Sequence, residues 1–257
     1  MNVRPKKHLG QHFLNDPNIA RKITGSILGQ PTVLLEVGPG TGALTRHLVE
    51  KFPYLIALEI DPESIAYLRT NQIISPDNII PADFLEYDLN KVLRPGACIV
   101  GNFPYNISSQ IFFKILDNKH LVDQVVGMVQ YEVAERIAAP PGSKQYGILS
   151  VLLNAFYRIE LLFKVPPTVF FPPPKVNSAV IRLSRNNRQQ LPCNEENFRL
   201  IVKTSFGQRR KMLRNSLRNL FPQETLSQPL FERRPEHITI EEFIELTRWY
   251  ETANNNP

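Results

Sequence analysis

Cysteine, metal-ligand spacings and long apolar runs are scarce in this sequence. Its two cysteines, Cys98 and Cys193, are far apart, and Cys98 falls in the apolar run ACIV, which indicates a reduced, buried thiol. The five histidines form no HxH or HExxH pattern, so we predict no metal site. No run of eighteen apolar residues occurs, and the basic N-terminal segment MNVRPKKHLGQHFL lacks the apolar core of a signal peptide. We therefore expect a cytoplasmic protein without a membrane span.

The chain has the size and composition of a globular protein. Its 257 residues, 42% of them hydrophobic and 21% charged, suffice for one large domain or for one domain with a small appendage. The formal net charge of +6 favours an anionic partner. Many basic proteins bind no nucleic acid, so the distribution of charge along the chain is the better guide.

Short apolar runs alternate with helical stretches over residues 31–183. We expect strands at 32–37, 54–60, 78–83, 97–102 and 123–130. Helices are expected after them, including one at 42–52 and one that Ser108 caps. This alternation predicts a parallel, doubly wound sheet, to which segments near 157–163 and 178–184 add an antiparallel pair at one edge. The predicted fold class is therefore α/β, with a Rossmann-like, mostly parallel sheet of seven strands.

The C-terminal part of the chain has a different composition. The proline-rich stretch 165–176 is incompatible with a helix or a central strand, so we predict a stiff loop. Apolar content drops at 186–192, which predicts a first domain at 1–185 and a second at 186–257. The second contains three stretches with helical periodicity, NFRLIVKTSF, QRRKMLRNSLRNLF and IEEFIELTRWY. We expect a small all-α domain whose last residues, 252–257, are frayed.

A glycine-rich turn follows the first strand of the predicted sheet. Gly38, Gly40 and Gly42 permit a tight turn and a close approach of the backbone to a ligand. Glu59 ends the second strand, 21 residues after Gly38, a spacing that suits a carboxylate holding the two hydroxyls of a ribose. NAD enzymes use a similar loop and acid, so this pattern alone leaves the cofactor open. A glycine turn without any ligand is the remaining alternative.

Asp83 stands at the end of the third predicted strand. A carboxylate there can accept a hydrogen bond from an adenine amino group, although an aspartate at this place can also merely stabilise a loop or cap a helix. The runs EVGPGTGALT, EIDP and ADFL together resemble the successive motifs of Rossmann-like class I methyltransferases. The resemblance implies S-adenosylmethionine as the cofactor, with Gly38 and Gly40 under its methionine part, Glu59 on its ribose and Asp83 on its adenine.

The segment Asn102-Phe103-Pro104-Tyr105 follows the fourth predicted strand. It resembles the (Asn/Asp/Ser)-Pro-Pro-(Tyr/Phe) motif of methyltransferases that act on exocyclic amino groups. The lone pair of an adenine amino nitrogen is delocalised into the ring, so the nitrogen must be held pyramidal. The Asn102 side chain and the Pro104 carbonyl can accept its two protons, and Tyr105 can stack on an extruded base. These three are the candidate catalytic residues, Asn102 also contacts the cofactor in this class, and a plain turn is the alternative.

Two further regions suggest contacts with nucleic acid. Phe170 and Phe171, braced by prolines, can form a second stacking wall, and we expect one of them to be buried and the other functional. Arg210, Arg214 and Arg218 are spaced four residues apart in a stretch, 199–218, that contains no acidic residue. A phosphate-binding helix is favoured over an ordinary solvated face, since such a face usually mixes signs. The full candidate set is Arg209, Arg210, Lys211, Arg214 and Arg218, with Arg4, Lys6 and Lys7 as a second contact.

Five segments along nearly the whole chain resemble the small-subunit ribosomal RNA adenine dimethyltransferases: HLGQHFL, EVGPGTGALT, GNFPYNIS, FFPPPKVNSAV and FGQRRKMLRNSL. The resemblance implies transfer of methyl groups to the N6 atoms of two adjacent adenines near the 3′ end of 16S rRNA. It also implies that His12 and Leu14 touch the cofactor, and that the partner is this RNA or the assembling small subunit. We expect a monomer.

The sequence departs from the family pattern at two places. His12 stands where the family usually has asparagine, and Phe103 stands where leucine is more common. Neither side chain is the inferred hydrogen-bonding group of the reaction.

Other functions remain to be separated from this one. A related enzyme that methylates large-subunit RNA and confers macrolide resistance shares most of these motifs. A DNA adenine methyltransferase would need a target-recognition insert, which we do not find. A ribosome-assembly or transcription factor could retain the fold without catalysis, and an NAD dehydrogenase would leave the Asn-Phe-Pro-Tyr segment unexplained.

Overall fold

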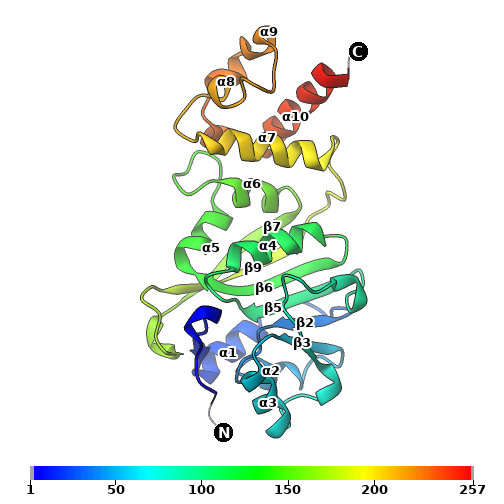
Figure 1. Cartoon of the computed structure of the whole chain (residues 1–257), viewed down its shortest axis with the longest axis vertical. Coiled ribbons are helices and arrows are strands. Elements are labelled where there is room, and N and C mark those ends of the chain that lie inside the picture. The colour runs from blue at the N-terminus through cyan, green and yellow to red at the C-terminus, as the bar shows by residue number, and fades with distance from the viewer. Residues whose placement is uncertain (1–2, 256–257) are drawn as a thin grey trace. The chain divides into compact units, whose positions relative to one another are not determined.

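The computed structural model describes residues 3–255, and its main element is a seven-stranded sheet with the strand order β4-β3-β2-β5-β6-β9-β7. Adjacent strands from β4 to β6 are parallel, and β9 is antiparallel to β6, which confirms the predicted fold class. Figure 1 shows β2, β5, β6 and β9 side by side. The strands are β2 (Leu34–Val37), β3 (Leu55–Glu59), β4 (Ile79–Pro81), β5 (Ala97–Asn102), β6 (Val122–Gln130), β7 (Tyr157–Val165) and β9 (Ser178–Arg185).

The central strands are buried along almost their whole length. Every residue of β2 is buried, and so is every residue of β5 except Asn102 at its end. The helices are α1 (Pro17–Thr24), α2 (Thr45–Leu48), α3 (Pro62–Thr70), α4 (Ser108–Asp117), α5 (Tyr131–Ala138), α6 (Ile148–Asn154), α7 (Glu195–Gly207), α8 (Leu213–Ser216), α9 (Gln223–Leu226) and α10 (Ile240–Asn255).

Two helix starts differ from the prediction. The α-helix after the glycine turn spans only Thr45–Leu48, not 42–52, because Gly42 has a φ of +77°, outside the helical region. Ser108 is the first residue of α4 and does not cap it, since the N-cap position is Ile107. The Ser108 hydroxyl donates instead to the carbonyl of Tyr105, at 3.2 Å, and so holds the loop before the helix.

The proline-rich stretch contains a strand as well as turns, which corrects the prediction of a loop throughout. Pro167–Val169 forms a 3-10 turn, and β8 (Phe170–Phe171) pairs antiparallel with β1 (Phe13–Leu14) in a separate two-stranded sheet. Prolines have no backbone N–H group, but Phe170 and Phe171 do, so these two residues can pair with a neighbouring strand. The N-terminal segment is thereby attached to this stretch.

The chain divides into two compact units, Met1–Ala134 with Ile159–Arg185, and Glu135–Arg158 with Asn186–Pro257. The second unit contains the predicted C-terminal domain and also 135–158, which the sequence assigned to the first domain. Within this unit, the ring of Tyr146 packs against that of Phe206 at 6.0 Å, and its hydroxyl donates to the Ile238 carbonyl at 3.0 Å. These contacts explain why 135–158 belongs with the C-terminal helices.

The second unit corrects two helix predictions. The expected helix over QRRKMLRNSLRNLF is wrong, since α7 ends at Gly207, Gln208 leaves the helical region at φ −125° and ψ 53°, and α8 is only Leu213–Ser216. At the C-terminus, α10 continues to Asn255, so the expected fraying at 252–255 is not observed, and residues 256 and 257 lie outside the described part.

No helix within residues 3–255 is long and apolar enough to cross a membrane.

Candidate active site

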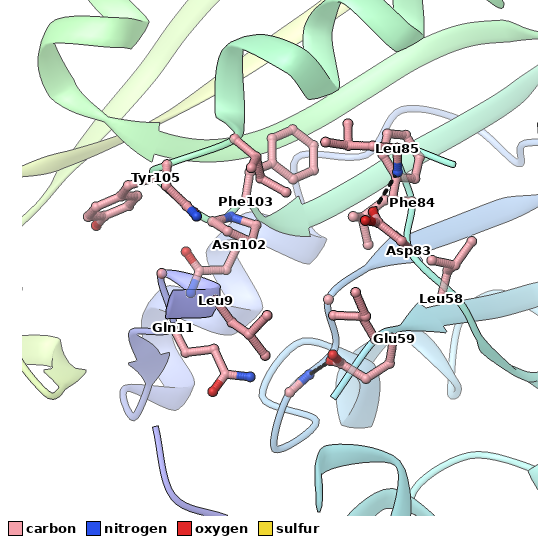
Figure 2. Close-up of a pocket in the computed structure, with 18 of the residues that line it drawn as sticks. Leu9, Gln11, Leu58, Glu59, Asp83, Phe84, Leu85, Asn102, Phe103 and Tyr105 are labelled. Carbon is pink, nitrogen blue, oxygen red and sulfur yellow. Dashed lines mark hydrogen bonds between the residues drawn. The ribbon is translucent and has the colours of Figure 1, made fainter. Parts of the chain in front are cut away.

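A pocket lies at the carboxyl ends of β2, β3 and β5, where a parallel sheet commonly binds its ligand (Figure 2). It combines segments that are far apart in the sequence: the N-terminal stretch at 8–13, the glycine turn, and the loops after β3, β4 and β5. In Figure 2, Asn102 and Tyr105 lie on one side of the pocket, and Glu59 and Asp83 on the other. The predicted site residues that line it are His12, Gly38, Gly40, Glu59, Asp83, Asn102, Pro104 and Tyr105.

The glycine turn has a conformation that only glycine adopts easily. Gly38 and Gly40 have φ values of +66° and +56°. A Cβ at Gly40 would stand 2.9 Å from the Phe13 ring, whereas a Cβ at Gly38 would have no neighbour within 4 Å. Because Gly38 lines the pocket, a side chain there would occupy space that the backbone now leaves open for a ligand.

Glu59 connects the glycine turn to the loop after β3. Its Oε2 accepts from the Gly40 N–H and its Oε1 from the Asp61 N–H, both at 2.9 Å. Burial raises the pKa of the Glu59 carboxyl, and these two backbone N–H groups oppose that rise. Each carboxylate oxygen has a second acceptor position, so Glu59 can hold the turn and still accept from ligand hydroxyls.

Asp83 combines the two interpretations that the sequence left open. Its Oδ1 accepts from the Leu85 N–H at 2.8 Å, which stabilises the loop after β4. The same half-buried side chain lines the pocket. A carboxylate can accept several hydrogen bonds, so the local bond leaves acceptor capacity for a ligand.

The orientation of the Asn102 side chain follows from its partner. Its Nδ2 donates to the carbonyl oxygen of His12 at 2.8 Å. A carbonyl oxygen can only accept, so this contact fixes which end of the amide is the NH₂ group. The Oδ1 atom is then the end left to accept a hydrogen bond in the pocket. The next residue, Phe103, donates its backbone N–H to the Met128 carbonyl at 3.0 Å, which attaches the segment to β6.

Tyr105 is held by an aromatic and a polar contact. Its ring stacks on the His12 ring, with centroids 5.2 Å apart and an interplanar angle of 29°. Its hydroxyl shares a hydrogen bond with the Ser178 hydroxyl. His12 in turn bonds through Nδ1 to the Pro172 carbonyl at 2.7 Å. Burial raises the pKa of Tyr105, so the phenol is neutral. No sequence pattern pointed to Ser178 as its partner.

The predicted division between the two phenylalanines is confirmed as to burial. Phe170 is 4% exposed and belongs to the hydrophobic core, whereas Phe171 is 58% exposed. Phe170 is therefore not placed to stack on a base. Leu14, which the family resemblance assigned to the cofactor, is also a buried core residue and does not line the pocket. Antiparallel pairing places it opposite Phe170.

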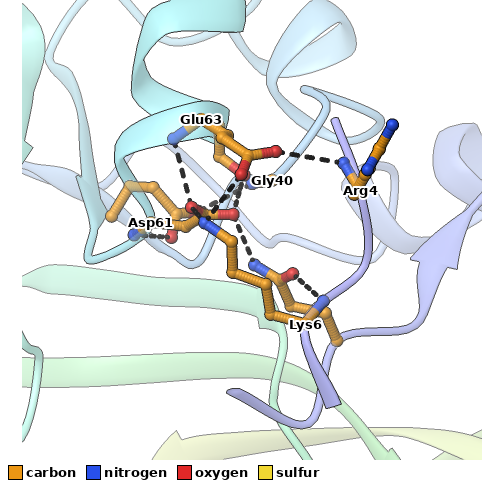
Figure 3. A network of polar contacts seen from close by, with 8 residues as sticks. Arg4, Lys6, Gly40, Asp61 and Glu63 are labelled. Atoms are coloured by element: carbon orange, nitrogen blue, oxygen red, sulfur yellow. Dashed lines mark hydrogen bonds and ion pairs between the residues drawn. The ribbon is translucent and has the colours of Figure 1, made fainter. Parts of the chain in front are cut away.

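A polar network attaches the N-terminal segment next to the pocket (Figure 3). Lys6 forms ion pairs with Asp61 and, at 3.3 Å, with Glu63. Gln11 donates from Nε2 to Asp61 at 3.0 Å, and the Arg4 backbone N–H donates to Glu63 at 3.3 Å. Lys6 is thus engaged within the protein, which corrects its prediction as a contact for an anionic partner. The Asp61-Pro62 pair signals a helix N-cap, but not this second role.

Glu36, below the glycine turn, is a further residue that sequence reasoning missed. It lies in the middle of β2, is 1% exposed, and its Oε2 has no hydrogen-bond partner among the described residues. Burial raises the pKa of Glu36 to about 8. Glu36 is therefore mostly protonated at neutral pH.

The basic residues of the second unit do not share one helical face. Arg209 is partly engaged, because its Nη2 donates to the carbonyls of Ser143, at 3.4 Å, and Lys144, at 2.5 Å. The others lie on exposed turns or on the short helix α8, and the exposed residues are Arg210, Lys211, Arg214 and Arg218. Within the described residues, no group of three or more side chains has the arrangement of a metal site.

A Rossmann-like sheet with an acceptor-lined pocket at its carboxyl edge, and with Asn-Phe-Pro-Tyr after its fourth strand, is the architecture of a class I methyltransferase for amino groups. The family model of ribosomal RNA adenine dimethylases matches residues 2–252, and the chain belongs to that family.

Relatives and solved structures agree with this assignment. The chain is 52% identical to "Ribosomal RNA small subunit methyltransferase A" of Phocaeicola vulgatus over 258 residues, covering 99% of the chain and 92% of the relative. It is 50% identical to the protein of the same name from Porphyromonas gingivalis over 252 residues, covering 96% and 98%. A dimethyladenosine transferase from Plasmodium falciparum shares the fold with a TM-score of 0.82 at 24% identity, covering 95% and 98%. The 23S rRNA methyltransferase ErmE has a TM-score of 0.70 at 26% identity, covering 92% and 99%.

Proposed function

We propose that this enzyme transfers methyl groups from S-adenosylmethionine to the N6 amino groups of two adjacent adenines near the 3′ end of small-subunit ribosomal RNA, giving N6,N6-dimethyladenine. Near-complete coverage at about half identity to relatives named for the small subunit supports this substrate over large-subunit RNA. The solved large-subunit enzyme ErmE is only 26% identical. The observation that carries the chemistry is the bond from Asn102 to the His12 carbonyl, which leaves the Asn102 Oδ1 atom as an acceptor.

The residues of the pocket fit the proposed cofactor. Gly38 and Gly40 offer open backbone for its methionine part, Glu59 offers acceptors for ribose hydroxyls, and Asp83 offers an acceptor for the adenine amino group. When bound, S-adenosylmethionine supplies an electrophilic methyl group on a sulfonium sulfur.

The protein's own contribution is to present the amino group. The Asn102 Oδ1 atom and the Pro104 carbonyl accept hydrogen bonds from the N–H groups of the amino group, and this directs the nitrogen lone pair at the methyl carbon. The proton that nitrogen loses becomes acidic on alkylation and passes to solvent, so no strong base is required. Catalysis is then mainly orientation, which in favourable systems contributes about 7–11 kcal/mol.

We propose that the target adenine stacks on two aromatic side chains that the protein holds in place. His12 covers one face of Tyr105, so we propose that the base stacks on the other face. Phe171 is the second stacking candidate, because it is exposed and its neighbour Pro172 is bonded to His12. Stacking of a base on an aromatic side chain contributes roughly 1–3 kcal/mol.

The second unit supplies the proposed RNA contacts. Arg210, Lys211, Arg214 and Arg218 are exposed and suited to phosphate groups, and Arg209 is assigned to the same surface with part of its capacity used internally. The proposed partner is the small-subunit RNA or the assembling subunit. We infer that the protein acts as a monomer in the cytoplasm.

The test compares Asn102→Ala and Asn102→Asp with the unaltered enzyme on small subunits that lack the modification. Removal of the acceptor in Asn102→Ala should lower kcat at least about a hundredfold, in the range known for loss of one aligned hydrogen-bonding group, while S-adenosylmethionine binding changes far less. Asn102→Asp, which keeps an acceptor, should retain more activity. Unchanged kcat in Asn102→Ala would refute the assigned role.

A further inference from the structure

Phe103 lines the pocket like its neighbours, but it is the one buried residue of the Asn-Phe-Pro-Tyr segment. Its side chain is fully buried. Its ring packs edge to face against Phe112 of α4, with centroids 5.8 Å apart and an interplanar angle of 76°. Because Phe103 lies between Asn102 and Pro104, a displacement of its ring that shifts the backbone also moves the two proposed acceptor groups.

Two glycines provide the space for this ring. Gly101 and Gly127 are direct partners across the parallel pair β5 and β6. A Cβ at Gly127 would lie 2.5 Å from Cε2, 3.0 Å from Cδ2 and 3.2 Å from Cζ of Phe103. A Cβ at Gly101 would lie 2.9 Å and 3.0 Å from Cε1 and Cδ1, on the opposite edge of the ring. Neither glycine has a positive φ, so each is required for space and not for its backbone conformation.

The two glycines differ in what else an added methyl group would meet. All three nearest neighbours of a Cβ at Gly127 belong to the Phe103 ring. A Cβ at Gly101 would in addition lie 2.6 Å from the Val37 carbonyl oxygen, a backbone atom of β2. Ordinary carbon contacts are about 3.5–4.0 Å, so both substitutions force a displacement. At Gly127, unlike at Gly101, the three closest obstacles all belong to the ring.

We propose that Gly127 is a positioning residue for amino-group methylation: its missing side chain admits the Phe103 ring between β5 and β6, and the seated ring sets the position of the Asn102 and Pro104 acceptors. The inference rests on the proposed function. Gly127 itself touches neither the pocket nor a substrate. It acts through the Phe103 ring, at the carboxyl end of the neighbouring strand.

The experiment is a double-mutant cycle between Gly127→Ala and Phe103→Leu, with the full-length protein and unmethylated small subunits. Leucine lacks the Cε and Cζ atoms of phenylalanine, so it removes the shortest contact of the new methyl group. We expect Gly127→Ala to lower kcat about thirtyfold to a hundredfold in the Phe103 enzyme, the scale of a reacting group misplaced by about an ångström. In the Phe103→Leu background, Gly127→Ala should lower kcat less than about threefold. The Kd for S-adenosylmethionine should stay within about threefold throughout.

Gly101→Ala provides the matched control. It also presses on the ring, but the clash with the Val37 carbonyl cannot be relieved at position 103. Phe103→Leu should therefore restore the kcat of the Gly127→Ala enzyme, and the kcat of the Gly101→Ala enzyme should stay low. Equal rescue of both glycine variants, or of neither, would overturn the assignment of Gly127.

A second readout keeps the inference testable if Gly127→Ala does not fold. Phe103→Ala removes the ring without adding a clash, and it should lower kcat at least about tenfold with the cofactor Kd little changed. Full kcat in that variant would overturn the positioning role. The proposed function is judged separately, by whether the unaltered enzyme transfers methyl groups to adenines of small-subunit RNA.

Discussion

Asn102 owes its orientation to a backbone carbonyl, that of His12. The departure from asparagine to histidine at position 12 therefore leaves this bond unaffected. The His12 ring makes two other contacts: it stacks on Tyr105 and forms a hydrogen bond with the Pro172 carbonyl. A residue that the family pattern assigns to the cofactor thus also supports Tyr105.

This arrangement predicts distinct effects for two changes at His12. His12→Ala keeps the backbone carbonyl but loses the stacking, which in such aromatic pairs contributes about 0.5–1.5 kcal/mol. We expect kcat/KM for the RNA substrate to fall roughly threefold to tenfold. His12→Phe retains the stacking and should recover most of the loss. Equal activity of both variants and the unaltered enzyme, measured at subsaturating substrate, would show that the ring contributes nothing.

Glu36 gives a prediction about stability and pH. Its folded-state pKa of about 8 lies above the ordinary value of 4.5, so its stabilising contribution is present below pH 4.5 and is lost as the pH rises through about 8. Glu36→Gln has no proton to lose. The unfolding free energy of the unaltered protein, relative to Glu36→Gln, should fall between pH 5 and pH 8.5 in denaturant titrations. A difference that does not vary with pH would contradict the buried, protonated state.

Sequence reasoning located most single residues of the site because they stand at strand ends. Glu59, Asp83 and Asn102 each follow or end a strand, and parallel strands bring those ends together. The choice between Phe170 and Phe171 was not predictable, since it depends on the pairing of β8 with β1. Glu36 gave no signal either, because a carboxylate in an apolar strand does not reveal its partners.

At the scale of elements, the N-terminal segment is held by Asp61. Burial raises the pKa of Asp61, but hydrogen bonds from Gln11 and Lys6 outweigh it and leave the pKa below its usual value. Because its pKa is depressed, the contribution of Asp61 to folding stability is present above the ordinary aspartate pKa. This contribution is lost as the pH falls through the depressed value. Residues 8–12 of the same segment line the pocket. The network therefore fixes a segment that lines the pocket.

Asp61→Asn should weaken S-adenosylmethionine binding by roughly threefold to tenfold at neutral pH, since the amide keeps the shape but loses the ion pair. Glu63→Gln is the control, because Glu63 is exposed and exposed ion pairs contribute little. Calorimetric titration of both variants checks this. If the two substitutions weakened binding equally, or not at all, Asp61 would not hold the segment over the ligand.

Strands were predicted better than helices, for a physical reason. The run at 97–102 became β5 with the same bounds, because buried parallel strands are apolar along their whole length. The helical period at 208–221 predicted one continuous helix, but a turn at Gln208 separates the buried Leu213 and Leu217 from α7. A break of this kind depends on tertiary contacts that periodicity does not contain.

On the scale of the whole molecule, the net charge of +6 is expected to act through the exposed arginines of the second unit. Reversal of two charges in Arg210→Glu/Arg214→Glu should weaken binding to small subunits and flatten the dependence of log K on log salt, because fewer counterions are released. Lys51→Glu, a charge reversal at an exposed site of the first unit, should leave both quantities nearly unchanged. Filter binding at several salt concentrations compares the two variants. An unchanged salt slope in the arginine variant would show that Arg210 and Arg214 do not contact the RNA.

The division of the whole chain was the least predictable feature. A drop in apolar content marks residue 186, but 135–158 joins the second unit through Tyr146 and its contacts. The composition of 135–158 does not differ from that of the sheet region, so only packing reveals the association.

The most direct test of the central claim supplies labelled S-adenosylmethionine to unmethylated small subunits, large-subunit RNA and adenine-containing DNA in parallel, followed by nucleoside analysis. The account predicts label in N6,N6-dimethyladenine of the small-subunit RNA and in neither of the other two substrates. Label confined to large-subunit RNA, or label in a nucleoside other than N6-methylated adenine, would contradict it.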